Sequence, residues 1–359
     1  MVYRERSTWV VKDAEILREE YDVEEVCFTH IRDLKRIIEL YECIRNSDLV
    51  FTWFANDHSF IACRFAKLMN KPVIIALGGG DITAIRSLNY GNLLRYPWKL
   101  YVTRSLDCAD FILAPSFFTK REALMRLKKL NPNKFLVLYH GFDIDKYALR
   151  NCQKEDIVLT IGSINRITIF RKGLMYFVRA AKFLPDVRFI MIGKPQDNAI
   201  NTLKSIAPPN VEFAGFLPEK DLIEFLQRSK VYVQASLHEG FGCAVAEAML
   251  AENVPVVTRM GALPEVVGST GIYVPYGDAR TLARAIEKAL SRPELGIKAR
   301  IRATKLFNIS RRKTILLKVI NLLLKGSNYE MNWLWDKGLQ SFHQQVLDQD
   351  YFPSLRRRI

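Results

Sequence analysis

The stretch that most constrains the fold spans residues 236–250, SLHEGFGCAVAEAML. It follows a short, β-branched apolar run at 231–235 that is typical of a buried strand, and it leads into a helix-like segment ending near Asn253. Another apolar run, at 254–258, predicts the next strand. A strand, a glycine turn and a helix start bring unpaired backbone N–H groups to a place where an anion is stabilised. We therefore predict a phosphate-binding turn made by Gly240, Phe241, Gly242 and Cys243.

Two glutamates flank this turn. Glu239 precedes it, and Glu247 lies inside the predicted helix. An ionised carboxylate only accepts hydrogen bonds, so its natural partners in a ligand are hydroxyl groups. A ligand that offers both phosphate and hydroxyl groups is a sugar nucleotide. The alternative is that both are ordinary surface glutamates, but the glycine turn between two apolar strands argues against it.

These residues resemble the signature of the retaining glycosyltransferases of family 4, which have the GT-B fold. The resemblance rests on Glu239, the glycine turn, the run Glu247-Ala248-Met249 and the run Pro264-Glu265-Val266-Val267. It implies that Glu239 and the turn face the donor sugar, while Glu247 holds the ribose hydroxyls. It also implies a metal-independent transfer, with retention of configuration, from a UDP-, GDP- or ADP-sugar to an unidentified sugar, lipid-linked or other acceptor.

The rest of the chain alternates apolar runs with helix-like segments. This alternation predicts an α/β protein with two doubly wound, Rossmann-like domains, and the resemblance implies an active site in the cleft between them. We place the first, acceptor-side domain at 1–148, the nucleotide-sugar domain at 149–326 and a tail at 327–359. The resemblance implies that this tail returns to the first domain, the alternative being a partly ordered end. Only Val2 and Tyr3 stand where the family has its first strand, so that strand is either short or truncated together with its glycine-rich loop.

Further candidate ligand-binding residues follow other predicted strands. Glycines at strand ends let a nucleotide approach the backbone closely. Gly79, Gly80 and Asp81 form one such turn, where Gly78 stands in place of the family's sugar-contacting histidine; the alternative there is a flexible loop without a ligand. The family holds the nucleotide base at a segment that matches Gly215-Phe216-Leu217. The remaining candidates are Gly162, Ser163 and Gly193.

A basic loop ends in Arg171-Lys172-Gly173. Without a metal, the charge on a departing pyrophosphate is stabilised by fixed cations and helix termini, and the family supplies one Lys and one Arg. Lys172 matches the Lys position, whereas the Arg position falls on Ser163 by alignment or on Arg166 by spacing. The catalytic candidates are therefore Glu239, Lys172 and Arg166, and the alternative is a solvated basic loop.

Composition sets further limits. The chain is 49% hydrophobic and 25% charged, as globular proteins are. It has no apolar run of about 20 residues and no apolar core of a signal peptide near its start, so we expect a cytoplasmic protein. The six cysteines are scattered without metal-ligand spacing, so we expect no metal and no cofactor besides the donor.

The net charge of +15 predicts attraction to polyanions. The predicted helix at 116–130 carries Lys120, Arg121, Lys128 and Lys129 beside Phe117 and Phe118, which favours either docking at an anionic inner membrane surface or a solvated face over an ordinary core. Two rival functions stay open. A sugar-nucleotide epimerase of similar fold would need an acid pair in the first domain, which no spacing singles out. A non-enzymatic membrane- or nucleic-acid-binding protein would explain the charge, but no specific nucleic-acid-binding motif is present.

Overall fold

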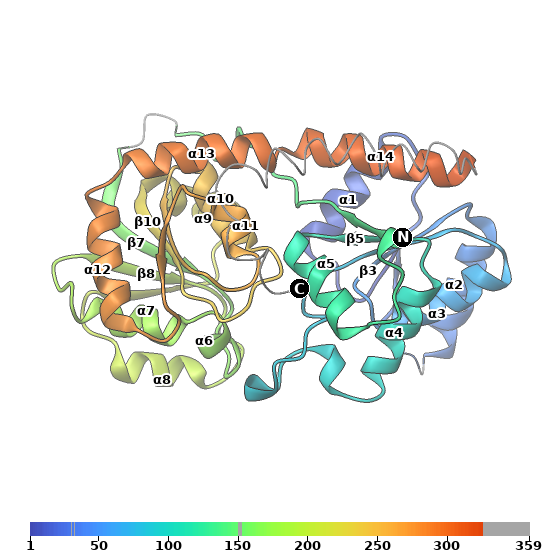
Figure 1. Cartoon of the computed structure of the whole chain (residues 1–359), viewed down its shortest axis with the longest axis horizontal. Helices are drawn as coiled ribbons and strands as arrows, with labels where there is room; N and C mark the ends of the chain where they lie inside the picture. Colours follow the sequence, from blue (N-terminus) through green and yellow to red (C-terminus); the bar gives the residue numbers. More distant parts are fainter. Residues whose placement is uncertain (30, 32, 150–152, 326–359) are drawn as a thin grey trace. The chain divides into compact units, whose positions relative to one another are not determined.

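The computed structural model describes residues 1–29, 31, 33–149 and 153–325 (Figure 1). The described chain divides into a first unit, residues 1–140 together with 310–325, and a second unit, residues 141–309. This division falls shortly before the predicted boundary at 148, and it gives residues 310–325 to the first unit rather than to the second. The predicted tail, 327–359, lies outside the described residues.

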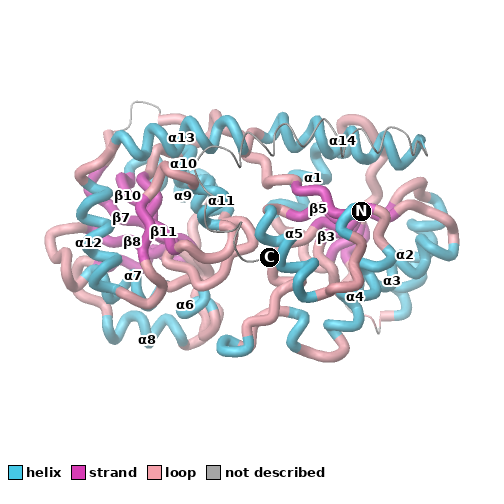
Figure 2. The backbone as a smooth tube through the Cα atoms, in the orientation of Figure 1, coloured by secondary structure: helices cyan, strands magenta, loops and turns pink. Residues whose placement is uncertain are grey.

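The first unit is built on a six-stranded parallel sheet, coloured magenta in Figure 2. Its strands are short and nearly every residue in them is buried, as expected of a sheet covered on both faces. The first strand, Val2–Tyr3, is two residues long and pairs with both of its neighbours in the sheet. In sheet order the strands are β2 (Val26–Cys27), β1 (Val2–Tyr3), β3 (Val50–Trp53), β4 (Val73–Ala76), β5 (Phe111–Ala114) and β6 (Phe135–Val137).

Six α-helices of the described chain accompany this sheet. The predicted helix at 116–130 ends early, at Arg126, so Lys128 and Lys129 lie beyond it. The last helix comes from the far end of the described chain and belongs to this unit, although the whole second unit precedes it in the sequence. The helices are α1 (Thr8–Arg18), α2 (Leu34–Asn46), α3 (Asp57–Leu68), α4 (Trp98–Cys108), α5 (Phe117–Arg126) and α14 (Ile309–Lys325), with 3₁₀ turns at Arg86–Leu88, Asn92–Leu94 and Pro132–Lys134.

The second unit contains a second six-stranded parallel sheet whose first strand lies in the middle. The next two strands in sequence, β8 and β9, lie on one side of that strand, and the last three, β10, β11 and β12, lie on the other side. Ligands of open α/β sheets bind at the carboxyl ends of the strands where the order reverses, which here are β7 and β10. In sheet order the strands are β9 (Val211–Gly215), β8 (Arg188–Ile192), β7 (Glu155–Ile161), β10 (Ser229–Gln234), β11 (Val254–Thr258) and β12 (Ile272–Val274).

The helices of this unit include one that the sequence analysis missed. The segment predicted as a basic loop contains a short helix, because the Asn165 side chain accepts hydrogen bonds from the backbone N–H groups of Ile167 (3.0 Å) and Thr168 (2.9 Å) and so holds its start. The helices are α6 (Thr168–Arg171), α7 (Leu174–Ala181), α8 (Ala199–Ile206), α9 (Glu219–Arg228), α10 (Cys243–Leu250), α11 (Leu263–Val267), α12 (Ala279–Leu290) and α13 (Glu294–Leu306).

Each unit thus repeats strand and helix around its own hydrophobic core. The predicted fold class, two doubly wound Rossmann-like α/β units, is confirmed.

A buried ion pair fastens α14 to the first unit. The Arg312 guanidinium meets the Asp13 carboxylate through two contacts of 2.7 Å, from Nε and Nη2. Arg312 Nη1 also donates to the carbonyls of Leu138 (3.3 Å) and Tyr139 (3.0 Å), and Trp53 Nε1 donates to Asp13 Oδ2 (3.1 Å). Because Asp13 is fully buried and Arg312 is 5% exposed, neither charge has water as an alternative partner.

We predict that Arg312→Met lowers the free energy of unfolding of the first unit by about 3–5 kcal/mol, since it leaves the Asp13 carboxylate buried without its cation. The matched control is Lys313→Met, which removes the exposed pair with Glu19 and should change the stability by about 1 kcal/mol or less. Urea unfolding followed by tryptophan fluorescence measures both, because Trp9, Trp53 and Trp98 lie in the first unit. Equal losses in the two variants would contradict this role of the buried pair.

Candidate functional site

The candidate site of the second unit lies at the carboxyl ends of β7 and β10. Gly162 and Ser163 follow β7, and residues 235–242 connect β10 to α10. The junction of α6 and α7 lies against this connection, since Leu237 N donates to the carbonyl of Arg171 (2.8 Å). The topology of the sheet therefore brings together three segments that the sequence analysis selected separately.

The Glu239 carboxylate is the centre of this group. It is 9% exposed, and its Oε1 accepts hydrogen bonds from Ser236 Oγ (3.0 Å) and Gln234 Nε2 (3.1 Å). Lys172 Nζ lies 3.5 Å and Arg171 Nη1 lies 3.6 Å from the same oxygen. Burial raises the pKa of Glu239, but the two cations and the hydrogen bonds outweigh it and hold the pKa below its ordinary value. Glu239 is therefore an ionised hydrogen-bond acceptor at neutral pH.

A row of polar side chains on one face of β10 supports Glu239. Tyr232 OH donates to Gln234 Oε1 (2.8 Å), and Gln234 Nε2 donates to Ser236 Oγ (2.7 Å). All three residues are buried. The sequence analysis treated this segment only as an apolar strand, yet polar residues at every second position were a visible signal, because alternate residues of a strand share a face.

Two glycines fix the position of Lys172. A Cβ atom on Gly162 would lie 2.7 Å from Lys172 Cδ, so the aliphatic stem of the lysine needs a residue without a side chain at the end of β7. Gly173 has a φ of +70°, and a Cβ there would lie 2.0 Å from the carbonyl oxygen of Ala235. The backbone therefore requires glycine at position 173, while glycine at position 162 leaves room for the observed path of the Lys172 side chain to Glu239.

The second cation beside Glu239 is Arg171, not Arg166. Arg166 is exposed, and its backbone N–H donates to Asp197 Oδ2 (3.0 Å). The guanidinium of Arg171 instead donates from Nη1 to the carbonyl of His238 (3.2 Å) and lies beside Glu239. The backbone carbonyl of Ser163 accepts from Thr168 Oγ1 (2.6 Å), so Ser163 helps to start α6. The short helix α6 turns Arg171 toward β10, and residue spacing in the sequence could not predict this helix.

The predicted anion turn has the expected backbone. Gly242, with a φ of +100°, precedes the first residue of α10, Cys243. The Phe241 side chain is buried against Phe307, with ring centroids 5.1 Å apart, so the ring belongs to the core. On α10, Glu247 is partly exposed and its Oε1 accepts from Tyr147 OH (3.2 Å), a partner that the sequence analysis did not select. Burial and Glu247 raise the pKa of Tyr147 well above its ordinary range, so it stays a donor.

The predicted base-binding segment lies at the end of β9. Gly193 N donates to the carbonyl of Gly215 (2.7 Å), which ties the ends of β8 and β9 together. A Cβ on Gly193 would lie 1.9 Å from the carbonyl oxygen of Gly162, so these backbones approach closely. Phe216 is 74% exposed and Leu217 is partly buried. An exposed aromatic ring beside a glycine is suited to stacking on a base, and this role stays a prediction.

The glycine turn of the first unit is closed by its own aspartate. The Asp81 carboxylate accepts backbone N–H groups from Gly79 (2.8 Å), Ala55 (3.1 Å) and Gly78 (3.3 Å), and it is 4% exposed. Its burial raises the pKa of Asp81. A Cβ on Gly80 would lie 2.7 Å from Tyr90 OH. These contacts stabilise the turn, and a ligand role for its residues stays a prediction.

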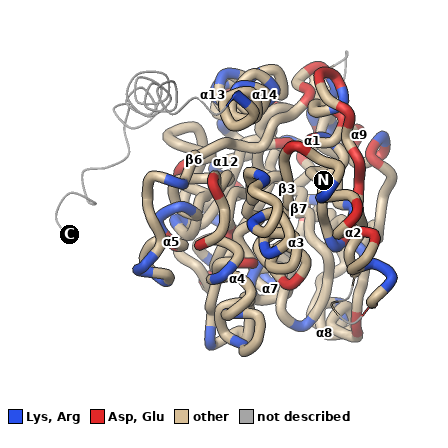
Figure 3. The backbone as a smooth tube through the Cα atoms, turned by 90° about the vertical axis from the view of Figure 1, so that its right-hand side faces the viewer, with Lys and Arg blue, Asp and Glu red and all other residues tan. Residues whose placement is uncertain are grey.

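Lys and Arg positions of α5 are blue in Figure 3. Two of these basic side chains bond to other groups of the protein. Lys120 Nζ donates to the carbonyl of Phe135 (3.1 Å), and burial lowers the pKa of Lys120. Arg126 pairs with Glu122 at 2.8 Å. Arg121, Lys128 and Lys129 are exposed. The structure thus leaves fewer solvent-facing cations here than the sequence suggested.

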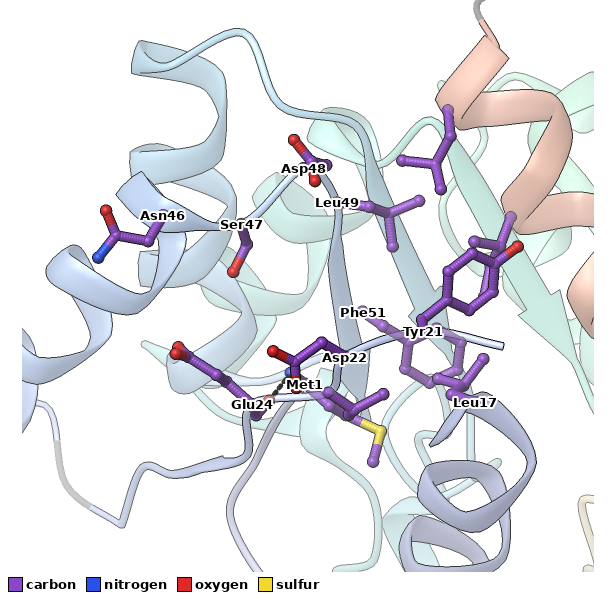
Figure 4. Close-up of a pocket in the computed structure, with 13 residues that line it drawn as sticks. Met1, Leu17, Tyr21, Asp22, Glu24, Asn46, Ser47, Asp48, Leu49 and Phe51 are labelled. Carbon is purple, nitrogen blue, oxygen red and sulfur yellow. Dashed lines mark hydrogen bonds between the residues drawn. The ribbon is translucent and has the colours of Figure 1, made fainter. Parts of the chain in front are cut away.

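The pocket in Figure 4 lies at the amino-terminal ends of the strands in the first unit, opposite to the ends that carry the glycine turns. It has a volume of about 320 Å³ and is lined by residues at the amino ends of β1 and β3, including Met1 and Leu49, together with Tyr21 and Glu24. The Met1 amino group donates to the carbonyl of Glu24, and burial lowers the pKa of this amino group. The glycine turns follow carboxyl ends of strands, so this pocket is separate from all the predicted ligand sites.

The described residues contain no group of three or more His, Cys, Asp and Glu side chains arranged to hold a metal ion. Within the same residues, no helix combines the length and the apolar character that a membrane crossing requires.

Residues 155–292 match the family model of glycosyl transferases group 1. These residues form a group 1 glycosyltransferase domain. The match covers β7 through α12 and includes Lys172, Glu239 and Glu247, so the resemblance inferred from the sequence is confirmed.

Related proteins extend the likeness beyond this glycosyltransferase domain. The chain is 27% identical over 194 residues to one component of the phosphatidylinositol N-acetylglucosaminyltransferase of Arabidopsis thaliana. These 194 residues are 52% of this chain and 43% of that protein. It is 24% identical to an uncharacterised glycosyltransferase of Methanocaldococcus jannaschii, over 74% of this chain and 73% of that protein. Anabaena HepE, solved in complex with UDP and glucose, matches with a TM-score of 0.72 and 14% identity over 89% of this chain and 98% of that chain. This last likeness confirms the GT-B fold.

We predict that Lys172→Met destabilises the protein more at neutral than at acidic pH. In the wild type the pKa of Glu239 lies below 4.5, so its ionised form stabilises the fold above that pH, and this stabilisation is lost as the pH falls through the folded-state pKa. Without Lys172, only Arg171 remains as a cation beside Glu239 to oppose the effect of burial, so the pKa of Glu239 rises. The difference in melting temperature between wild type and variant should therefore narrow as the pH is lowered toward 4 and widen toward pH 7.

Melting curves recorded between pH 4 and 8 measure this difference. The control is Lys230→Met, which removes the surface pair with Asp156 (2.6 Å) and should shift the melting temperature little. Parallel curves for wild type and Lys172→Met across this range would show that Lys172 does not hold Glu239 ionised.

Proposed function

We propose that this protein is a retaining glycosyltransferase that moves a sugar, of the hexosyl type, from a nucleotide-sugar donor to an acceptor without a metal ion or further cofactor. The observation that carries the proposal is the convergence of Lys172 and Arg171 on the buried Glu239, between β7 and β10 of a group 1 glycosyltransferase domain. The structure solved with UDP and glucose supports a nucleotide-sugar donor by analogy.

The proposed chemistry follows from the charges. A nucleoside diphosphate gains negative charge as the glycosidic bond breaks, and preorganised cations stabilise it at that moment. Lys172 and Arg171 are held beside Glu239 before any donor arrives, so the donor phosphates compete with one carboxylate for two cations that are already in place. The ionised Glu239 then accepts hydrogen bonds from sugar hydroxyls, and Glu247 accepts those of the ribose.

The donor is identified first, by a thermal-shift panel of UDP-, GDP- and ADP-sugars, because a ligand selective for the native state raises the melting temperature. Transfer and donor hydrolysis are then measured in the presence of EDTA. We expect Lys172→Ala to lower the turnover rate on the order of a hundredfold or more, and Arg171→Ala to lower it as well.

Arg166→Ala is the matched control and should leave the rate close to that of the wild type, since the Arg166 side chain is exposed and its backbone bonds to Asp197 rather than to the Glu239 group. If Arg166→Ala and Lys172→Ala retained equal rates, the leaving-group role of Lys172 would be wrong. Activity that appears only after a divalent ion is restored would contradict the metal-independent reaction.

Glu247→Ala should weaken nucleotide binding by about tenfold or more, because hydrogen bonds to a charged group are each worth roughly 1.5–3 kcal/mol. The companion variant is Tyr147→Phe, which removes only the donor to Glu247 Oε1 and keeps the carboxylate. Isothermal titration with the matching nucleoside diphosphate compares the three proteins. Wild-type affinity in Glu247→Ala would remove Glu247 from the ribose site.

The acceptor is proposed to be anionic or membrane-associated. This part rests on the net charge of +15 and on the exposed Arg121, Lys128 and Lys129. Co-sedimentation with anionic liposomes at low and high salt tests it, and a protein that stays in solution at low salt would favour a freely dissolved acceptor. The comparisons favour neither the epimerase nor the non-enzymatic alternative.

A further inference from the structure

Helices α3 and α4 of the first unit pack side by side (Figure 1). Each carries one cysteine whose thiol contacts the backbone of the other helix. Cys63 is in the middle of α3, and Cys108 is the last residue of α4. The Cys108 thiol donates to the carbonyl of Cys63 (3.4 Å), and the Cys63 thiol reaches the carbonyl of Ser105 (3.7 Å). Each thiol thus contacts the backbone of the helix that carries the other cysteine.

The two thiols differ in their access to solvent. Cys63 is 1% exposed, whereas Cys108 is only partly buried. Both line a pocket of about 610 Å³ between α3 and α4. A reagent in this pocket therefore meets the Cys108 sulfur first, and the Cys63 sulfur is then reached through Cys108.

The rim of this pocket is basic. Four Lys and Arg side chains line it against two aspartates: Arg64, Lys67, Arg104 and Lys134, with Asp107 and Asp110. Lys134 Nζ also donates to the carbonyl of Asp107 (2.7 Å), which holds its charge near the end of α4. A small anionic reagent is therefore attracted to the Cys108 side of the pocket.

The surroundings also favour the thiolate of Cys108. The hydrogen bond from the Cys63 thiol lowers the pKa of Cys108 to about 7, with Lys67 and Lys134 adding to the effect, while burial and the Asp110 carboxylate oppose it. The same hydrogen bond, together with burial, raises the pKa of Cys63. By contrast, burial raises the pKa of Cys43 to about 11. The thiolate is the nucleophilic form of cysteine. At neutral pH Cys108 is therefore the better nucleophile of the two, whereas Cys63 stays a thiol.

We propose that Cys108 and Cys63 form an oxidisable dithiol, in which Cys108 attacks a small anionic disulfide such as glutathione disulfide and Cys63 resolves the product into an intramolecular disulfide between α3 and α4. Neither residue of this pair belongs to the candidate site of the second unit, so the dithiol is a separate modification site.

The reaction balances in two exchanges. In the first, the Cys108 thiolate bonds to one sulfur of glutathione disulfide and the other sulfur leaves as a glutathione thiolate. In this step the Cys108 thiolate is consumed, so the Cys63 thiol loses the acceptor of its hydrogen bond. In the second, Cys63 loses its proton to water, bonds to the Cys108 sulfur and releases the second glutathione thiolate. Two protein thiols are oxidised by two electrons, and one glutathione disulfide is reduced to two thiols.

The experiment exposes the folded full-length protein to a series of glutathione redox buffers at pH 7, quenches with acid, blocks free thiols with N-ethylmaleimide and maps non-reduced peptides by mass spectrometry. We expect a peptide pair joined through Cys63 and Cys108. Cys63→Ala should stop the reaction at one glutathionyl group on Cys108, and Cys108→Ser should abolish both products. Cys43→Ser is the matched control and should give the same cross-link as the wild type.

A second measurement follows the rate of N-ethylmaleimide labelling of Cys108 against pH. In the wild type this rate should rise around pH 7, and in Cys63→Ala, which lacks the thiol donor, the rise should move to higher pH. Circular dichroism checks that each variant is folded, and Cys63→Val, which also lacks a donor, replaces Cys63→Ala if the latter is not. The proposal is overturned if Cys108 reacts no faster than Cys43, or if wild-type Cys108 keeps its glutathionyl group without forming the cross-link.

Discussion

The carboxyl edge of the second sheet is arranged around one buried negative charge, that of Glu239. A carboxylate at this depth stays ionised only if cations and hydrogen-bond donors replace the water that it has lost. Lys172 and Arg171 supply the cations, and Ser236 and Gln234 supply the donors. The same need explains why an otherwise apolar strand carries polar residues on one face.

The need to bring Lys172 to the Glu239 carboxylate also determines where glycines occur in this site. Lys172 approaches Glu239 over Gly162, at the end of β7, where a Cβ would meet the stem of the lysine. Gly173 allows the chain to turn directly after the lysine, close to the Ala235 carbonyl. The glycines of this site are therefore fixed by a long side chain and a neighbouring backbone as much as by any ligand.

Much of the fold could be predicted from the sequence, because buried parallel strands leave short apolar runs and their turns leave glycines. The strand before Glu239 and the start of α10 at Cys243 follow from such local patterns, whereas the place of Lys172 beside Glu239 was implied by the family resemblance. The choice between arginines could not be predicted, since it depends on a four-residue helix whose start is held by hydrogen bonds to the Asn165 side chain. The contact between Tyr147 and Glu247 joins residues far apart in sequence, for which a single sequence carries no signal.

The return of α14 to the first unit affects the order in which this protein can fold during synthesis. Domains generally fold as units, the N-terminal one first. Here the second unit is one continuous segment, 141–309, whereas the first unit lacks its last helix until residues 310–325 have been made. Until then Asp13 has no arginine, and the surface that α14 will cover is open to water. The unit that leaves the ribosome first is therefore completed last, after the glycosyltransferase domain has been synthesised in full.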